Sequence, residues 1–177
     1  ETIAFEPSTS NLRILSRNIS INNLSSKIKI FPLPLSDEDN AFSKMKEENF
    51  LEGGAMNVFK ENFNFEGNKF NSEMNYTTFG TSINFLIENN ILNIPDYIKI
   101  DVDGAEHLIL EGGNRFLNNK KIKSLSIELN ENFKEQFDKV IEIMNNNKFK
   151  ILHKKHNSNL IGNNTKLLST FNYIFER

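Results

Sequence analysis

The chain contains no cysteine and no tryptophan, and only four of its 177 residues are proline. The lack of cysteine excludes disulfide bonds and thiolate metal sites, and it is typical of proteins that work in a reducing compartment. The three histidines, His107, His153 and His156, are too dispersed in the sequence to suggest a zinc motif. We therefore expect a cytoplasmic protein without a bound metal.

A strong excess of one charge and a long apolar run are also absent. The formal net charge is -2, which gives no overall basic surface for nucleic acid or for an anionic membrane. No apolar run approaches the ~20 residues that a membrane-spanning helix needs, and the opening ETIAFEP does not resemble a signal peptide. We expect a single domain over residues 1–177 that has neither nucleic acid nor a membrane as its partner.

Apolar strands alternate with amphipathic helices along most of the chain. This order predicts an α/β fold with a doubly wound, mostly parallel sheet and an antiparallel strand pair at the C-terminus. The predicted strands span residues 2–5, 28–33, 97–102, 122–129, 149–152 and 171–175. One predicted helix begins after Ser8 or Ser10, and the others span residues 82–89, 105–117 and 133–146. Between them, residues 39–80 form a polar excursion with scattered phenylalanines, which we expect to contain short strands and to serve as a lid or a wall over the site.

The segment from Asp96 to Gly113, DYIKIDVDGAEHLILEGG, is the most informative part of the sequence. Asp101 and Asp103 follow a strand that is too apolar to have one wet face, and their spacing of two predicts that they project from the same face. Open α/β sheets bind ligands at this end of their strands. With Glu106 they form an acidic cluster that can stabilise a cation or take up a proton. Alternatively, one of the two aspartates caps the following helix and the other faces the ligand.

Other acidic strand ends are weaker candidates. Glu6 closes the first strand, where a carboxylate can accept the two hydroxyl groups of a ribose, although a contact with the dipole of the next helix explains it as well. Ser36 and Asp37 follow the second strand and can read an adenine edge or simply form a turn. Glu128 ends the strand after the acidic turn, and a solvated strand end is an equal alternative.

Four separated stretches together resemble the FkbM-type S-adenosylmethionine-dependent methyltransferases. They are EPSTSNLRILSRNISINN, FPLPLSDED, TSINFLI and DYIKIDVDGAEHLILEGG, in the family's order and at similar separations. The resemblance implies a Rossmann-like methyltransferase fold, S-adenosylmethionine as cofactor, and methyl transfer to a hydroxyl oxygen of a sugar, a glycan or a natural-product-type small molecule. Acceptor recognition is then expected in the excursion, between Phe42 and Phe79.

The resemblance also implies roles for single residues. Glu6 binds the cofactor ribose with Asn11 nearby, and Ser36 and Asp37 lie near the adenine. Asp101 lies beside the methionine part of the cofactor. Asp103 and Glu106 lie at the substrate side and, with Asp101, form the catalytic group.

Two features depart from the family pattern. The strand and glycine-rich turn that normally wrap the cofactor are missing, and Asn84 stands where the family usually has an acid. The missing strand normally lies between the strand of Glu6 and the strand of Asp101, so two central strands are left with unpaired edges. We therefore expect an incomplete methyltransferase domain, a fragment of a longer protein, in which the gap closes by direct pairing of these two strands or is filled by another chain in a homo-oligomer. The alternative function is a truncated or degenerate fold that acts as a binding module without catalysis.

Overall fold

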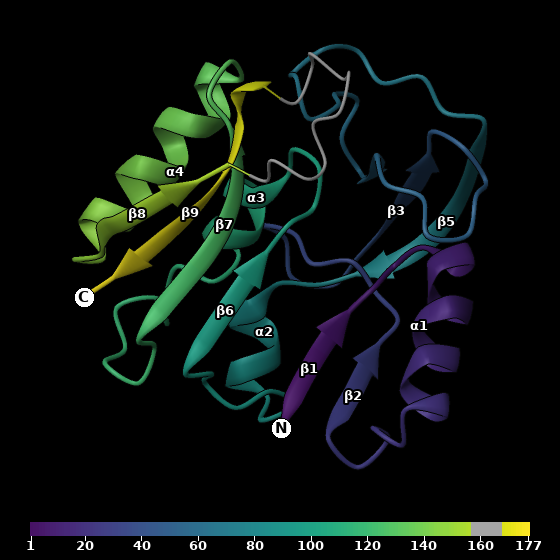
Figure 1. Ribbon diagram of the computed structural model, residues 1–177, viewed down its shortest axis with the longest axis horizontal. Helices are drawn as coiled ribbons and strands as arrows, with labels where there is room; N and C mark the ends of the chain where they lie inside the picture. Colours follow the sequence, from purple (N-terminus) through teal and green to yellow (C-terminus); the bar gives the residue numbers. More distant parts are fainter. Residues whose placement is uncertain (157–167) are drawn as a thin grey trace.

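The protein is a mixed α/β structure with strands in three separate sheets. A computed structural model describes residues 1–156 and 168–177 (Figure 1). The elements are β1 (Thr2–Phe5), α1 (Thr9–Ile21), β2 (Ile28–Phe31), β3 (Ala41–Glu47), β4 (Asn57–Phe59), β5 (Met74–Gly80), α2 (Ile83–Glu88), β6 (Tyr97–Ile100), α3 (Glu106–Glu111), β7 (Ser124–Asn130), α4 (Lys134–Asn146), β8 (Lys150–Lys155) and β9 (Thr170–Glu176).

Two parallel strand pairs carry the strand ends at which the sequence predicts a site. β1 pairs with β2 through α1, and β6 pairs with β7 through α3. In Figure 1, β6 and β1 lie between β7 and β2. The helix α1 begins after Ser8, whose side chain accepts a hydrogen bond from the backbone N–H of Asn11, as the predicted cap requires.

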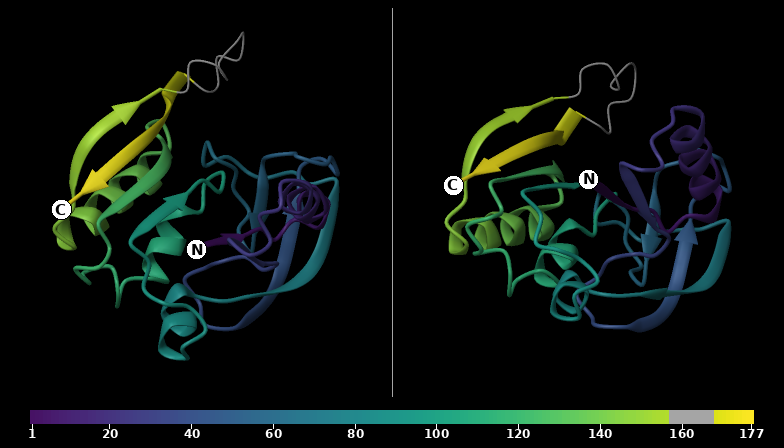
Figure 2. Two further views of the ribbon diagram at one scale, coloured as in Figure 1. Left: turned by 60° about the horizontal axis from the view of Figure 1, so that its bottom comes forward. Right: turned by 90° about the horizontal axis from the view of Figure 1, so that it is seen from below.

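The main core lies between α3, α4 and the four-stranded sheet, in which the strand order is β6-β7-β9-β8. β7 runs through the middle of this core, and the side chains of Leu125, Ile127 and Leu129 are almost fully buried. β9 pairs with β7 and with β8 in the antiparallel direction, which confirms the predicted pair at the C-terminus. The views in Figure 2 show α4 along one face of this sheet.

The excursion forms a sheet of its own, with the antiparallel order β4-β3-β5. Along β3, the side chains of Met45 and Glu47 are buried, whereas Phe42 and Lys44 on the opposite face are exposed. The sequence predicts short strands here. β3 and β5 span seven residues each and pair with one another over their whole length.

The prediction of one doubly wound, mostly parallel sheet is only partly confirmed. The α/β class is correct, but the strands separate into three small sheets, and most strand pairs are antiparallel. Several elements also end earlier than predicted. β2 ends at Phe31 because Pro32 has no N–H to donate, and α3 ends at Glu111 where Gly112 and Gly113 follow.

No helix among residues 1–156 and 168–177 is long and apolar enough to cross a bilayer.

The core assignment predicts a large effect of Leu125→Ala and a small effect of Leu152→Ala. The side chain of Leu125 has 0% exposure, whereas Leu152 on β8 is 56% exposed. Truncation of a buried leucine costs about 2–5 kcal/mol, and surface substitutions stay within about 0.5 kcal/mol. Urea denaturation followed by circular dichroism measures both. Equal losses of unfolding free energy in the two variants would contradict the placement of β7 in the core.

Candidate functional site

The acidic turn after β6 is tightly wound. β6 ends at Ile100, and both Asp103, with φ of 59°, and Gly104, with φ of 126°, have positive φ. Side chains alternate between faces only along extended backbone. The prediction that Asp101 and Asp103 project from one face of a continuing strand is therefore wrong, because the strand has ended before either residue.

The excursion packs directly over this turn. The backbone N–H of Met56 donates to Oδ2 of Asp103 at 2.7 Å. A Cβ atom at Gly104 would lie 3.1 Å from the carbonyl oxygen of Asn64 and from the Cα of Phe65, so only glycine fits beneath the excursion. Burial raises the pKa of Asp103 above its ordinary value. These contacts agree with the predicted wall over the site.

Glu106 holds the turn from below. Its fully buried carboxyl group accepts hydrogen bonds from the backbone N–H of Val102 at 3.1 Å, from that of Gly104 at 3.1 Å and from Nε2 of Gln136 at 2.5 Å. Burial raises the pKa of Glu106 to about 7 despite these donors. The expectation that an aspartate caps the next helix is wrong: α3 begins after Ala105 without a side-chain cap.

Asp101 lies at the open side of the turn. Its side chain is 37% exposed and forms an ion pair with Lys99. His107, one residue after Glu106, packs against the rings of Phe63 and Phe133, and burial lowers its pKa.

Glu6 approaches the acidic turn from the other parallel pair. Its carboxylate accepts a hydrogen bond from the backbone N–H of Ser8 at 2.9 Å. Burial raises the pKa of Glu6, and repulsion from Glu47 and Asp103 adds to this effect. The carboxyl group of Glu6 therefore lies within electrostatic range of Asp103.

Asn11 connects Glu6 to the excursion. Its side chain donates to the carbonyl oxygen of Gly54 at 3.0 Å and accepts from the backbone N–H of Gly53 at 2.8 Å. A hydrogen bond with Asn11 also lowers the pKa of Glu6 in part. The loop between β3 and β4 therefore closes on the start of α1 at one side and on Asp103 at the other.

Ser36 and Asp37 make the contacts of an ordinary turn. Ser36 is buried, and its hydroxyl oxygen accepts from the backbone N–H of Glu38 at 3.3 Å. Asp37 forms an ion pair with Lys60 at 3.2 Å. No contact of the described structure joins these two residues to Glu6 or to the acidic turn.

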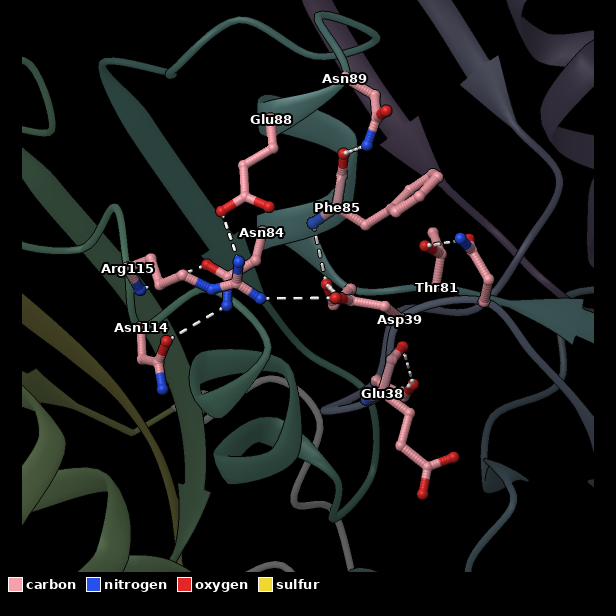
Figure 3. Close-up of polar contacts among 12 residues, drawn as sticks. Glu38, Asp39, Thr81, Asn84, Phe85, Glu88, Asn89, Asn114 and Arg115 are labelled. Atoms are coloured by element: carbon pink, nitrogen blue, oxygen red, sulfur yellow. Dashed lines mark hydrogen bonds and ion pairs between the residues drawn. The ribbon is translucent and has the colours of Figure 1, made fainter.

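A polar cluster beside the turn of Ser36 and Asp37 explains why an asparagine fits at position 84 (Figure 3). The buried Asn84 side chain donates to Oδ1 of Asn114 at 3.2 Å and accepts from the backbone N–H of Arg115 at 3.2 Å. Arg115 in turn bridges Glu88 at 2.5 Å and Asp39 at 3.4 Å. Asn84 thus ties α2 to the segment after α3, a role that an amide fills with both its donor and its acceptor.

A small cavity opens beside the acidic turn. Its lining combines carboxyl, amide and hydroxyl groups with two apolar side chains, and consists of Met56, Phe65, Asp103, Gly104, Glu106, Glu128, Asn130, Gln136 and Thr170. Burial raises the pKa of Glu128 to about 7, and Asp101 and Asp103 add to the shift. The buried hydroxyl oxygen of Thr170 has no hydrogen-bond partner within residues 1–156 and 168–177.

A second buried acid near Glu6, Glu47, was not identified from the sequence. Glu47 has 0% exposure, and its Oε1 accepts a hydrogen bond from the hydroxyl group of Tyr76 at 2.9 Å, whereas Oε2 is buried without a partner. Tyr76 also binds the backbone of Pro7 and Thr9 and so joins β5 to the start of α1. The alternation along β3 is the signal that could have placed Glu47 on the inward face.

Within residues 1–156 and 168–177, no group of three or more His, Cys, Asp or Glu side chains is arranged to hold a metal ion.

Comparisons with known proteins point to one family. Residues 1–151 match the methyltransferase FkbM domain. The crystal structure of methyltransferase FkbM from Methylobacillus flagellatus KT matches with a TM-score of 0.59 and 16% sequence identity, over 99% of this chain and 36% of that chain. The chain therefore spans about a third of the length of that protein. The search of curated proteins gave no match.

The buried carboxyl group of Glu106 predicts how stability changes with pH. Its pKa is about 7 in the folded chain against an ordinary 4.5, so the folded state binds more protons between these values and loses stability as the pH rises through this window. Relative to Glu106→Gln, the wild type should lose on the order of 3 kcal/mol between pH 4 and pH 8.

Urea unfolding at a series of pH values measures this difference. The matched control is Glu142→Gln, because Glu142 is exposed on α4. A constant difference between the wild type and Glu106→Gln at all pH values would contradict the assignment.

Proposed function

Because the chain belongs to the methyltransferase FkbM domain family, we propose that it transfers a methyl group from S-adenosylmethionine to a hydroxyl oxygen of a sugar, a glycan or a natural-product-type small molecule. The observation that carries this proposal is the loop between β3 and β4, which binds Asn11 near Glu6 after β1 and Asp103 in the turn after β6, and so connects the ends of two strands from different sheets. Ligands of α/β folds bind where strand ends of this kind meet.

The residues around Glu6 fit the cofactor. Glu6 and Glu47 are carboxyl groups with few donors, since Glu6 accepts one backbone N–H and Oε2 of Glu47 has no partner. A ribose presents two hydroxyl donors, and a sulfonium group presents a positive charge, and both relieve the repulsion among buried carboxylates. We assign the ribose to Glu6 and the methionine part to Asp101. S-adenosylmethionine supplies an activated methyl group on a sulfonium.

The other assignments differ in how directly the residues reach a ligand. Asp101 is exposed and Asp103 lines the cavity, so both can face a bound molecule. Glu106 is enclosed by three hydrogen-bond donors. We therefore propose that Glu106 positions the turn and that Asp103 acts at the acceptor. The proposed neighbours of the adenine remain Ser36 and Asp37.

We further propose that the two parallel pairs belong to one Rossmann-like sheet that is completed by another chain. β1 is hydrogen-bonded only to β2, and β6 only to β7, so each has an unpaired edge among the described strands. The backbone N–H groups of Thr2 and Glu6 donate to β2, hence the N–H of Ile3 points to the free edge of β1. An edge of this kind is a template for strand pairing, and a homo-oligomer follows.

A binding module without catalysis is the second candidate. The contacts of the excursion favour this candidate, because Asn11 and Asp103 are already hydrogen-bonded to the loop between β3 and β4. The two candidates differ in one property, since only the methyltransferase must bind the cofactor or its product.

The proposed function predicts that the chain binds the cofactor product. The chain should bind S-adenosylhomocysteine, and Glu6→Gln should weaken binding about tenfold or more, because hydrogen bonds to a charged group contribute about 1.5–3 kcal/mol. Isothermal titration calorimetry measures both. Glu142→Gln, on the exposed face of α4, is the control and should bind as the wild type does. A folded wild-type chain that binds neither S-adenosylmethionine nor S-adenosylhomocysteine would favour the binding module.

The second prediction concerns strand pairing. The wild type should form a discrete oligomer, and Ile3→Pro should shift it to a monomer, because proline removes the N–H at the free edge of β1. Ile3→Val keeps that N–H and should stay oligomeric. Light scattering gives the mass, and circular dichroism confirms that each variant is folded. A folded wild type that is monomeric at all concentrations would overturn the pairing proposal.

A further inference from the structure

Glu128 stands next to Asp101 across the parallel strands β6 and β7. The register pairs Tyr97 with Ser124 and Ile100 with Ile127, so Asp101, the first residue after β6, follows directly beside Glu128 within β7. The two side chains interact, since a hydrogen bond with Asp101 and repulsion from it both act on Glu128. Strand register and side-chain contact together place these two carboxyl groups next to each other.

The cavity gives Glu128 access to a ligand. Glu128 is half-buried and lines the cavity together with Asp103, Asn130 and Thr170. Asn130 is held from both sides, because its side chain donates to the carbonyl oxygen of Phe65 at 3.1 Å and accepts from the backbone N–H of Asn132 at 3.0 Å. Among the described residues, the buried hydroxyl oxygen of Thr170 has no hydrogen-bond partner. The cavity therefore offers an incoming hydroxyl group the carboxyl group of Glu128 and the hydroxyl group of Thr170.

The other acids of the site are already engaged. Asp103 accepts a hydrogen bond from Met56, Asp101 is paired with Lys99, and Glu106 is closed off by its three donors. The contact of Glu128 with Nδ2 of Asn172 is long, at 3.5 Å. Of the three carboxyl groups that line the cavity, Glu128 is thus the one whose N–H donor, among the described residues, is the most distant.

We propose that Glu128, supported by Asp101 on the adjacent strand, takes up the proton of the methyl acceptor. The assignment rests on the proposed function and adds a catalytic residue to it. As the acceptor oxygen forms its bond to the methyl carbon, the carbon–sulfur bond breaks and its electron pair stays on sulfur. The acceptor proton moves to the carboxylate of Glu128, which later releases it to solvent.

The charges that face Glu128 make it suitable for this role. The pKa of Glu128 is raised to about 7. Burial is the largest cause, and repulsion from Asp101, a hydrogen bond with Asp101 and repulsion from Asp103 act in the same direction. The charge of Lys99 opposes them. A general base is most effective when its pKa lies near the working pH. Loss of the Asp101 charge should lower the pKa of Glu128, and loss of the Lys99 charge should raise it.

The first test needs neither cofactor nor acceptor. In the 177-residue chain labelled with ¹³C at the glutamate side-chain carboxyl groups, NMR titration should show two carboxyls near pH 7, those of Glu106 and Glu128, and one of the two should disappear in Glu128→Gln. In Asp101→Asn its midpoint should fall by about 1 unit or more, and Glu142→Gln should leave it unchanged. A Glu128 midpoint that is the same in the wild type and in Asp101→Asn would overturn the support from Asp101.

The second test measures catalysis with glucose, mannose and rhamnose as probe acceptors and radiolabelled S-adenosylmethionine as donor. Glu128→Gln should lower kcat about 100-fold or more with KM little changed, and Glu128→Asp should recover part of the loss. The acidic limb of the pH–rate profile should lie near pH 7 in the wild type and shift to lower pH in Asp101→Asn.

The outcomes separate the two proposals. A Glu128→Gln variant with kcat close to the wild type, or an acidic limb that Asp101→Asn leaves in place, would overturn the role of Glu128 while methyl transfer itself stands. Absence of transfer by the wild type to every probe would contradict the proposed function and with it the role of Glu128 as base. The titration would then still report whether the carboxyl pair exists.

Discussion

The carboxyl group of Glu106 is the interaction on which the candidate site depends. It accepts the backbone N–H groups of Val102 and Gly104 and is tied to α4 through Gln136. The turn that it holds contains two consecutive residues with positive φ, Asp103 and Gly104. Such a conformation persists only where the surroundings determine it. A buried acid below the turn thus fixes the direction of the acids above it, at the cost of a raised pKa.

The excursion completes the site from the other side. Its loop between β3 and β4 binds Asn11 at the start of α1 and Asp103 in the acidic turn. The two parallel strand pairs share no backbone hydrogen bonds, so this loop is one of the connections that hold their ends together. Movement of the loop would change the distance between Glu6 and Asp103. The proposed binding of a ligand between these two residues therefore depends on the hydrogen bonds of the loop with Asn11 and Asp103.

The sequence predicts the strand ends of the site better than the roles of their side chains. The apolar run before Asp101 and the strand before Glu6 locate both acids correctly, since these patterns are local. The enclosure of Glu106 depends on Gln136, which lies 30 residues away, and a buried acid looks the same in sequence as a reactive one. The strands of the excursion were expected, but the burial of Glu47 was not, because it depends on contacts such as that with Tyr76, which lies 29 residues away. The importance of Glu128 follows from the register of β6 and β7, which the sequence does not show.

Hydrogen exchange with mass spectrometry tests the central claim most directly. The proposed cofactor site lies between Glu6, directly after β1, and the acidic turn after β6. Addition of S-adenosylhomocysteine should therefore slow amide exchange in residues 6–11 and 101–106 and leave the exposed strand β8 unchanged. Unchanged exchange throughout the folded chain, or protection confined to the outer face of the sheet β4-β3-β5, would contradict it.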